Sequence, residues 1–424
     1  MDVPWKLIES AESLKHCLQP TDVIVDALLG IGVVGGPRGL CAELIKVVND
    51  SGLPVVSLDV PSGLDANTGE GNGAVRADWT ITMAFPKPGL FKNDGFHQSG
   101  TVRVIGIGLP KDISESAIAE SDMDVFSHQD ARTLLPRRKP AGHKNTFGHL
   151  LCLCNSVDYS GAGELCAVAA LRMGAGLVTL AVPEQSHFRE GPAALIHRTL
   201  EGGRFCADNL TKLAQLLNGK SAVVYGPGTG AAVDAAFLEE LISRKLPMVI
   251  DADGLRLLAA NPKLMNLELP EDKCPPLALN TIPTPRTVLT PHPGEMRALL
   301  DGFGLQEFAD ASRTDQAKSL AKRTGCVVAL KGRFTVVAEP TGRTTLNLSG
   351  DVSLATAGSG DVLSGCIGAL LAEGLAPADA ARLGVFLHGL AAELRHTPGR
   401  SLIADDLPGL LPEAIAAIGG SAAI

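Results

Sequence analysis

The sequence predicts two α/β domains, each built on a doubly wound parallel sheet. The chain has 424 residues, too many for one ordinary hydrophobic core. Short aliphatic runs bounded by turn residues alternate with segments of helical periodicity along most of its length. Hydrophobic residues make up 45% of the chain and aromatic residues only 4%. Val, Ile, Leu and Ala must therefore fill the cores, as in parallel sheets covered on both faces.

The first block, residues 1–110, has four predicted strands rich in β-branched residues. They lie at 22–29, 54–60, 79–85 and 101–108. Between the first two, residues 39–52 have helical spacing and end in a glycine, which predicts a crossover helix. These elements make only a fragment of a parallel sheet, so the block is predicted to be a partial domain of the Rossmann type.

Residues 111–142 are predicted to be a linker. The segment begins acidic (KDISESAIAESDMD) and turns basic (LPRRKPAGHK), and such a shift of composition is typical of a surface connection. His143 and Lys144 stand at its end, where the second block begins, and are candidates to face a site in that block.

The second block, residues 143–424, continues the alternation and is predicted to form one doubly wound domain. Its predicted strands lie at 149–155, 177–183, 221–228, 247–253, 287–291, 326–332 and 334–340. Its predicted helices lie at 164–176, 231–245, 253–262, 315–325, 361–374 and 378–396. Ligands of such sheets bind beyond the carboxyl ends of the strands, so functional residues are expected in the turns that follow the strands.

The composition narrows the range of partners. A formal net charge of −9 argues against nucleic acid, which clustered Lys and Arg would hold, but allows a small anionic ligand at a locally positive site. The nine cysteines include no C-x-x-C pair, and the chain shows no leader and no apolar run of membrane-spanning length. We therefore expect a soluble cytoplasmic protein without a membrane partner, with Cys152 and Cys154 as reduced core residues. Whether it forms a homo-oligomer is open.

Two turns after predicted strands have compositions that suit a site. In GPGTG, residues 226–230, glycines let backbone N–H groups approach an anion at a helix N-terminus, although a plain tight turn explains them equally well. In DADG, residues 251–254, Asp251 or Asp253 could bind a hydroxyl group or a metal, or could cap the next helix.

Two further turns carry a histidine and two cations. In TPHPGEM, His292 lies between two prolines that restrict the backbone, and both a structural and a catalytic role are open. In ALKGRFTVV, Lys331 and Arg333 flank a glycine between two predicted strands. This arrangement suits phosphate binding, and it also suits a solvated hairpin turn.

The segment LATAGSGDVLSGCIGALL places an acid at the start of a predicted helix. Apolar residues have helical spacing from Val362 onward, so Asp361 lies near the helix start, after a turn of Gly358, Ser359 and Gly360. N–H groups of that turn could stabilise negative charge, and Asp361 could take a proton from a substrate hydroxyl. A plain acidic helix cap is the alternative. With the KGR and GPGTG turns, the segment favours an anion hole plus a base, as phosphoryl transfer to an alcohol requires.

Several motifs, in this order, resemble one enzyme family. HKNTFG, YSGAG, GPGTG, DADGL, TPHPGEM, KGRFT and LATAGSGDVLSG are similar to the NAD(P)H-hydrate dehydratases, a branch of the ribokinase-like fold, over most of 140–424. The resemblance implies removal of a hydroxyl group from carbon 6 of the hydrated nicotinamide ring of NADHX or NADPHX. In that chemistry ADP, or ATP in some members, phosphorylates the hydroxyl so that it becomes a good leaving group, and magnesium assists.

The resemblance also implies roles for single residues. Asp361 matches the catalytic residue, which would deprotonate the hydroxyl group. Ala162, Gly228 and His292, with Asp361, would hold the hydrated dinucleotide. The adenine nucleotide would bind the KGRFT and GSG turns, namely Lys331, Gly332, Arg333, Phe334, Thr335, Gly358 and Gly360. CLCNS at 152–156 replaces glycines of the family and is expected to reshape one wall of the pocket.

The first block resembles the NAD(P)H-hydrate epimerase domain that is often fused in front of the dehydratase. The matching motifs are VDALLGIGVVGGPR, LDVPSGLD and FPKPGL. Asp26 and Ser62 match potassium ligands, and the substrate contacts match Gly30, Ile31, Gly32, Val33, Val34, Gly35, Gly36 and Asp59. Only 25 residues precede Asp26, and no NNGGDG loop occurs. Epimerase activity is therefore expected only if the chain is a piece of a longer product.

Two other functions are alternatives. A small-molecule kinase of the same fold would use ATP and stop at the phosphate ester, but TPHPGEM and KGRFT match the dehydratase branch. A nucleotide-binding module without turnover conflicts with Asp361 and the GSG turn in the second block. In the first block, a partial sheet could serve as an interaction surface.

Overall fold

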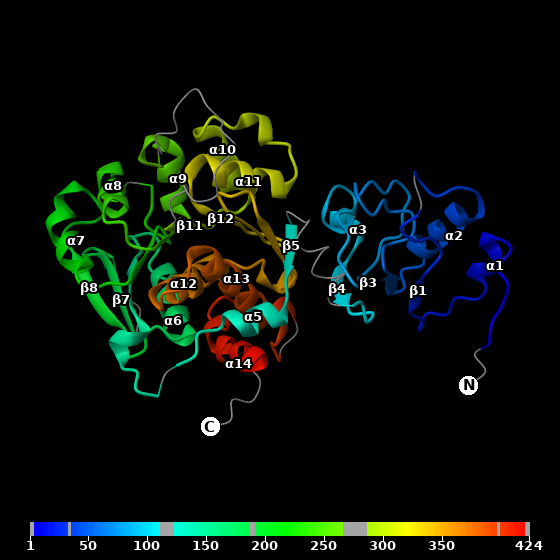
Figure 1. The fold of residues 1–424 in the computed structure, drawn as a ribbon, viewed down its shortest axis with the longest axis horizontal. Helices are drawn as coiled ribbons and strands as arrows, with labels where there is room; N and C mark the ends of the chain where they lie inside the picture. The colour runs from blue at the N-terminus through cyan, green and yellow to red at the C-terminus, as the bar shows by residue number, and fades with distance from the viewer. Residues whose placement is uncertain are drawn as a thin grey trace. The chain divides into compact units, whose positions relative to one another are not determined.

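The computed structural model of the chain describes residues 4–32, 35–110, 123–138, 140–186, 191–231, 233–265, 286–396 and 399–419. The chain divides into two compact units, Met1–Ser121 and Asp122–Ile424. Both units are α/β structures in which helices cross over between parallel strands (Figure 1). The predicted fold class is therefore confirmed.

The first unit contains a parallel sheet of four strands in the order β1-β2-β3-β4. The strands are β1 (Ile24–Asp26), β2 (Val55–Leu58), β3 (Trp79–Met83) and β4 (Thr101–Ile105), within the four predicted ranges. The predicted crossover helix is α2 (Gly39–Asp50), and its Ile45 and Val48 pack with Val55 and Val75 in a small core. The shorter helices are α1 (Ala11–Lys15), η1 (Pro88–Phe91) and α3 (Gly95–Gln98).

The second unit contains a sheet of ten strands in the order β5-β14-β13-β12-β11-β10-β9-β6-β7-β8. From β12 to β8 all neighbours are parallel, whereas β13 is antiparallel to both β12 and β14. The strands are β5 (Met123–Phe126), β6 (His149–Leu153), β7 (Leu177–Pro183), β8 (Ile196–Leu200), β9 (Ala222–Tyr225), β10 (Met248–Ile250), β11 (Thr287–Leu289), β12 (Val327–Leu330), β13 (Val336–Ala338) and β14 (Thr344–Asn347).

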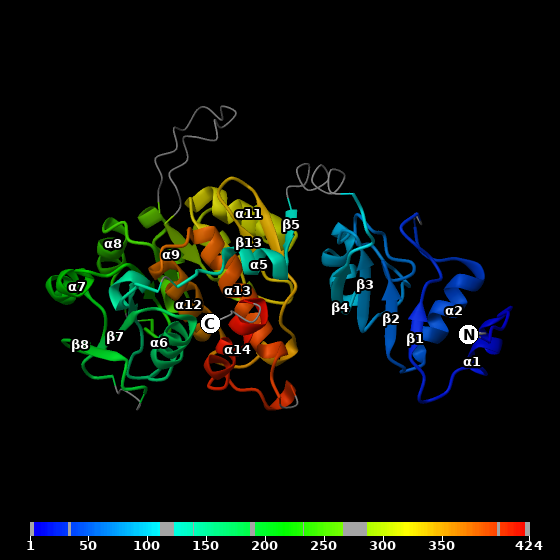
Figure 2. The same ribbon diagram turned by 60° about the horizontal axis from the view of Figure 1, so that its bottom comes forward.

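Helices cover both faces of this sheet (Figures 1 and 2). One layer comprises α5 (His128–Leu134), α6 (Ala162–Met173), α12 (Ser359–Ala372), α13 (Pro377–Glu393) and α14 (Leu407–Gly419). The other comprises α7 (Leu210–Leu217), α8 (Ala235–Ser243), α9 (Asp253–Ala260), α10 (Pro293–Gly302) and α11 (Arg313–Thr324). Short 3-10 turns complete the unit: η2 (Lys144–Phe147), η3 (Ala207–Asn209), η4 (Pro262–Met265), η5 (Gln306–Phe308), η6 (Val352–Leu354) and η7 (Gly399–Ser401).

The helix α12 lies at the centre of its layer. It contacts α6 and α13 on its sides and β9 and β10 beneath it, and every residue from Val362 to Ala372 is buried. Such burial on all sides explains why this segment is hydrophobic all round rather than amphipathic. Cys152 and Cys154 are buried free thiols in the same core, as predicted.

The second unit begins earlier than the sequence predicts. Part of the predicted linker, 111–142, forms β5 and α5, and β5 pairs in parallel with β14. One of the charged residues that suggested a surface connection has a specific partner: Asp124 of β5 accepts a 2.6 Å hydrogen bond from Arg343, which precedes β14. Residues 111–122 and 139 lie outside the described residues.

Within the described part of the chain, no helix has both the length and the apolar character needed to cross a membrane.

Candidate active site

The chemically distinctive residues of the second unit follow neighbouring parallel strands. β6, β9, β10, β11 and β12 lie next to one another and run in the same direction, so their carboxyl ends meet at one edge of the sheet. Asn155, Gly226, Asp251, His292 and Lys331 come just after these strands. This edge is where the sequence predicts a site.

Asp251 and Lys331 form a buried ion pair at this edge. Nζ of Lys331 lies 2.6 Å from Oδ1 of Asp251 and 3.8 Å from Oε2 of Glu295. Oδ2 of Asp251 accepts a 2.7 Å hydrogen bond from the hydroxyl group of Ser364 in α12. Burial disfavours the charged ammonium, but Asp251 and Glu295 outweigh it and raise the pKa of Lys331. Lys331 is thus a fixed positive charge.

Asp361 is the third residue of α12, and its carboxyl group is largely removed from water. Burial, and then the negative charge of Asp251, raise its pKa from 3.8 to about 8, against the opposing effect of Lys331. A carboxyl group with this proton affinity can exchange a proton near neutral pH. The N-cap of α12 is Gly358, without a side-chain cap bond, so helix capping does not account for Asp361.

The turn before Asp361 depends on glycine. Gly358 has a φ of +89°, which favours glycine, and a Cβ there would lie 2.6 Å from Cδ1 of Leu165. A Cβ on Gly360 would lie 3.3 Å from Nζ of Lys331. The first N–H groups of α12, which have no partner within the helix, therefore lie close to an ammonium group. N–H groups and an ammonium together suit a phosphate.

His292 is fixed at the start of α10. Its Nδ1 accepts hydrogen bonds from the N–H groups of Gly294 (3.0 Å) and Glu295 (3.3 Å), so the ring caps the helix. In return, Oε2 of Glu295 accepts the N–H of His292 at 2.9 Å. Because Glu295 also faces Lys331, one carboxylate connects His292 to the central ion pair. His292 therefore has a structural role as a helix cap, which is one of the two alternatives that the sequence left open.

Ala162 and Gly228 lie together at the same edge. Gly228 has a φ of +65°, and a Cβ on it would lie 2.9 Å from the Cβ of Ala162, the first residue of α6. Asn155 anchors this end of α6, because its Oδ1 accepts the N–H of Gly163 at 2.6 Å and its amide donates to Glu164 at 2.8 Å. Asn155 belongs to CLCNS, the stretch expected to reshape one wall of the pocket, and its contacts hold the first turn of α6.

The KGRFT turn connects the antiparallel strands β12 and β13. Gly332 has a φ of +143°, and the hydroxyl of Thr335 donates a 3.0 Å hydrogen bond to its carbonyl group. The guanidinium group of Arg333 lies over the ring of Phe334, 4.7 Å from its centroid. Lys331 connects this turn to Asp251 and α12.

Three residues that the sequence analysis missed support this arrangement. Arg313, at the start of α11, donates to the carbonyl groups of Leu330 (3.0 Å) and Lys331 (3.1 Å). Ser364 holds Asp251 from α12. His388 of α13 is buried, and its burial lowers its pKa to about 4 although a hydrogen bond to the backbone of Ser359 works against this. Nothing local in the sequence distinguishes these residues, because their partners are distant along the chain.

In the first unit, Asp26 and Ser62 meet at the carboxyl end of β1. Asp26 is 3% exposed and accepts hydrogen bonds from the hydroxyl groups of Ser57 (2.7 Å) and Ser62 (2.6 Å) and from the N–H of Ser62 (2.9 Å). The hydroxyl of Ser62 also lies 3.2 Å from the carbonyl oxygen of Leu29. This cluster of oxygen atoms resembles the ligand set of a hard cation, and it also stabilises the turn by itself.

Asp59 follows β2 with a φ of 68°, which is unusual for a residue with a side chain. Its Oδ1 accepts the N–H of Met83 at 3.0 Å and contacts the ammonium group of Lys87. Burial opposes ionisation, but the hydrogen bonds from Lys87 and from the backbone N–H of Met83, together with the charge of Lys87, outweigh it and lower the pKa of Asp59. The predicted glycine-rich contact loop begins after β1 with Gly30, Ile31 and Gly32 and continues with Gly35 and Gly36. Val33 and Val34 lie outside the described residues.

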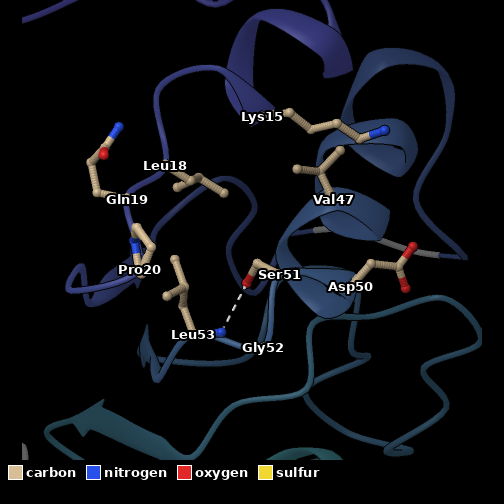
Figure 3. A pocket seen from close by; sticks show the side chains of 9 residues that line it. All are labelled: Lys15, Leu18, Gln19, Pro20, Val47, Asp50, Ser51, Gly52 and Leu53. Carbon is tan, nitrogen blue, oxygen red and sulfur yellow. Dashed lines mark hydrogen bonds between the residues drawn. The ribbon is translucent and has the colours of Figure 1, made fainter.

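An open hollow of about 540 Å³ lies elsewhere on the first unit (Figure 3). Residues of α1, the 18–20 segment and the end of α2 line it. Its lining residues 18–20 precede β1 and its lining residues 51–53 precede β2, so the hollow lies at the amino ends of these strands, away from Asp26 and Asp59. In neither unit do the described residues contain three or more His, Cys, Asp or Glu side chains placed to hold a metal ion.

Fold and site together define an α/β protein with the ribokinase-like fold, in which a glycine turn at a helix start lies beside a lysine and a largely buried carboxyl group. The sequence profile of the NAD(P)H-hydrate dehydratase family matches residues 150–408, and that of the YjeF-related protein N-terminus matches residues 1–89. The bifunctional NAD(P)H-hydrate repair enzyme Nnr of Moorella thermoacetica is 37% identical over 408 residues, which cover 92% of this chain and 72% of that enzyme. The chain belongs to this family of bifunctional NAD(P)H-hydrate repair enzymes.

Other relatives agree. The Escherichia coli repair enzyme Nnr is 35% identical over 396 residues, which cover 92% of this chain and 70% of that enzyme. The structure of the ADP/ATP-dependent NAD(P)H-hydrate dehydratase of Bacillus subtilis, co-crystallized with ATP/Mg²⁺, has a TM-score of 0.53 at 27% identity and covers 70% of this chain and 98% of that chain. A ribokinase-like superfamily protein of Enterococcus faecalis has a TM-score of 0.56 at 20% identity, with coverage of 70% and 97%, and supports the fold.

Proposed function

We propose that the second unit dehydrates the S forms of NADHX and NADPHX to NADH and NADPH at the expense of ADP, or of ATP. The observation that carries this proposal is the position of Asp361. A carboxyl group with a pKa of about 8 lies at the start of α12, beside a glycine turn and the ammonium group of Lys331. The activities for which the relatives are named, including the ADP/ATP dependence of the Bacillus enzyme, support the substrate and the nucleotide.

In this proposal, ionised Asp361 accepts the proton of the substrate hydroxyl group while the oxygen of that hydroxyl group attacks the terminal phosphorus of the nucleotide. Lys331 and the N–H groups at Gly358 and Gly360 stabilise the negative charge of the transferred group. The bond from carbon 6 to oxygen then breaks, phosphate leaves, and the ring loses a proton from the neighbouring carbon. ADP becomes AMP, and one phosphate forms for each NADH or NADPH.

The remaining predicted contacts divide between the two ligands. Gly332, Arg333, Phe334 and Thr335 are proposed to bind the adenine nucleotide on the KGRFT turn. Ala162, Gly228 and His292 are proposed to hold the hydrated dinucleotide, which places the two ligands on either side of Asp361. These positions belong to the same edge of the sheet, and the contacts of Ala162 with Gly228 and of His292 with Glu295 support the assignment.

Magnesium is proposed to arrive with the nucleotide, as in the ATP/Mg²⁺ crystals of the Bacillus relative. The described residues form no cluster of three or more metal-ligating side chains. Magnesium commonly keeps several waters and binds substrate phosphates, so a site made of the nucleotide's phosphates and water fits this protein. Its chemistry would be to neutralise phosphate charge.

For the first unit, we propose interconversion of the R and S hydrates, with substrate at Asp59 and at the loop from Gly30 to Gly36. Potassium is proposed to bind at Asp26 and Ser62, where buried oxygen atoms already gather. The match to the YjeF-related N-terminus supports the epimerase role.

Product analysis tests these assignments. The chain is incubated with S-form NADHX and ADP or ATP, and NADH, AMP or ADP, and phosphate are quantified. Equal amounts of NADH and phosphate support the dehydratase. An accumulating phosphate ester without NADH would show a kinase, and nucleotide binding without any product would show a binding module. For the first unit, Asp361→Asn protein is given R-form NADHX with and without potassium, and the absence of S form by chromatography would refute the epimerase.

A further inference from the structure

Asp251 is a buried carboxylate of the second unit to which the proposed dehydratase mechanism assigns no role. It is 1% exposed, and each of its carboxylate oxygens has a strong partner: Lys331 at 2.6 Å and Ser364 at 2.7 Å. The helix that follows does not need it, because the N-cap of α9 is Ala252 and no side chain makes a cap bond there. Helix capping, the alternative that the sequence left open, is therefore not its role.

The two partners of Asp251 connect three separate parts of the site. Lys331 follows β12, Asp251 follows β10, and Ser364 lies one turn along α12 from Asp361. A Cβ placed on Gly360 would lie 3.3 Å from Nζ of Lys331 and 3.8 Å from Oδ2 of Asp251. The ion pair therefore lies directly against the first turn of α12. Moving Asp251 would move the ammonium group relative to this turn.

The charges around Asp361 come from several elements. Asp251 and Asp253, around the start of α9, and Cys166 in α6 act against its ionisation, whereas Lys331 after β12 favours it. Farther out, Glu295 in α10 faces Lys331. Burial keeps His388 in α13 neutral, so it contributes no charge. Asp251 exerts the largest effect on Asp361 of any single neighbouring group.

We propose that Asp251 is a positioning residue of the dehydratase: it holds the Lys331 ammonium group against the first turn of α12 and keeps a negative charge beside Asp361. This inference rests on the proposed function of the second unit. The carboxylate of Asp251 thereby acts on both reactants, the nucleotide phosphate and the substrate hydroxyl group. The fixed ammonium group receives the phosphate, and the adjacent negative charge makes Asp361 a stronger base for the hydroxyl proton.

The direction of the effect follows from the charges. In Asp251→Asn, Asp361 loses a like charge and feels the full charge of Lys331, and both changes favour its ionised form. The acid limb of kcat/KM should therefore move to lower pH, by about one pH unit. Because Lys331 also loses its anchor, the plateau of kcat/KM should fall on the order of 10- to 100-fold. A residue that only stabilised the fold would lower activity without moving the pH midpoint.

Two matched variants serve as controls. Ser364→Ala removes a hydrogen bond to Asp251 but keeps its charge, so the pH midpoint should stay in place. Asp253→Asn removes a carboxylate that has a smaller effect on Asp361, so its midpoint should move less than that of Asp251→Asn. Thermal melting is recorded for each variant.

The pKa of Asp361 is also measured directly, by titrating ¹³C-labelled aspartate carboxyl groups by NMR, with Asp361→Asn to assign the signal. This readout separates two failures. If the wild-type chain does not dehydrate NADHX, the proposed function fails, but the titration still tests the inference. If the pKa of Asp361 is the same in wild type and Asp251→Asn, the inference is wrong even if turnover is high.

If Asp251→Asn does not fold, wild type is compared with the double variant Asp251→Asn/Lys331→Met, which leaves no buried charge unpaired at these positions. The pKa of Asp361 must be lower in the double variant, because Asp251 has a larger effect on it than Lys331. An unchanged or higher value would overturn the proposal.

Discussion

Replacing Asp361 by Asn removes the proposed general base while keeping the size of the side chain. Loss of a general base lowers the rate of proton transfer roughly 100- to 10,000-fold. The wild-type enzyme should also show this base in its pH profile. With a pKa of about 8, about one tenth of Asp361 is ionised at pH 7 and about half at pH 8. The value of kcat/KM should then rise roughly fivefold between pH 7 and pH 8 and level off above pH 9.

The assay follows the absorbance of NADH formed from S-form NADHX and ADP between pH 6 and pH 9.5. Asp361→Asn should lose the acid limb together with the activity, while calorimetry should show ADP binding within a few-fold of wild type. Asp361→Glu, which keeps a carboxyl group, should retain a pH limb at reduced activity. If Asp361→Asn kept a wild-type rate, or kept the same acid limb at a lower rate, another group would be the base and the reasoning would be refuted.

Three further predictions follow from the contacts. His292→Ala should lower the free energy of unfolding by about 1 kcal/mol because α10 loses its cap, whereas His292→Asn should keep the cap. If the imidazole ring also holds substrate, both variants should raise KM for NADHX in steady-state assays. An unchanged KM would show that the ring only caps the helix. Gly358→Ala should cost about 1–3 kcal/mol in chemical denaturation and abolish turnover, because the φ of +89° and the side chain of Leu165 oppose a Cβ, and wild-type stability would contradict this. The pKa of Asp361 is about 8 in the folded chain, against an ordinary value of 3.8, so its contribution to stability is present below pH 4 and is lost as pH rises through 8. Asp361→Asn should therefore gain stability relative to wild type between pH 5 and pH 8. Melting temperatures of the two proteins that differ by the same amount at every pH would contradict the raised pKa.

Local patterns were enough to predict the fold class and most strands of both units. The strands β5, β8 and β14 were missed. β8 (IHRTL) and β14 (TTLN) consist largely of polar residues, and β5 (MDVF) lies in the charged segment that was predicted to be a linker. Their stability depends on partners that are remote in the sequence. Asp124 of β5, for example, forms its ion pair with Arg343, 219 residues away. A charged run with such a partner is indistinguishable from a linker until the sheet is formed.

Some features of the candidate site could likewise be predicted from local sequence patterns, and others could not. Asp361, Gly358 and Lys331 were predictable because each follows a strand or begins a helix in a segment with unusual small or charged residues. The contacts of Asp251, on which its proposed role rests, could not be deduced, since Lys331 and Ser364 are 80 and 113 residues away from it. The proton affinity of Asp361 was equally hidden, because it depends on burial and on a carboxylate supplied by another loop.

The most direct test of the central claim is to mix the purified chain with S-form NADHX and ADP and to follow the near-ultraviolet absorbance of NADH, with samples that lack nucleotide or contain ATP. The proposed dehydratase predicts that absorbance returns when nucleotide is present, does not return without it, and is lost in Asp361→Asn. No recovery with either nucleotide, or equal recovery without one, would contradict the proposal that the second unit is a nucleotide-dependent NAD(P)H-hydrate dehydratase.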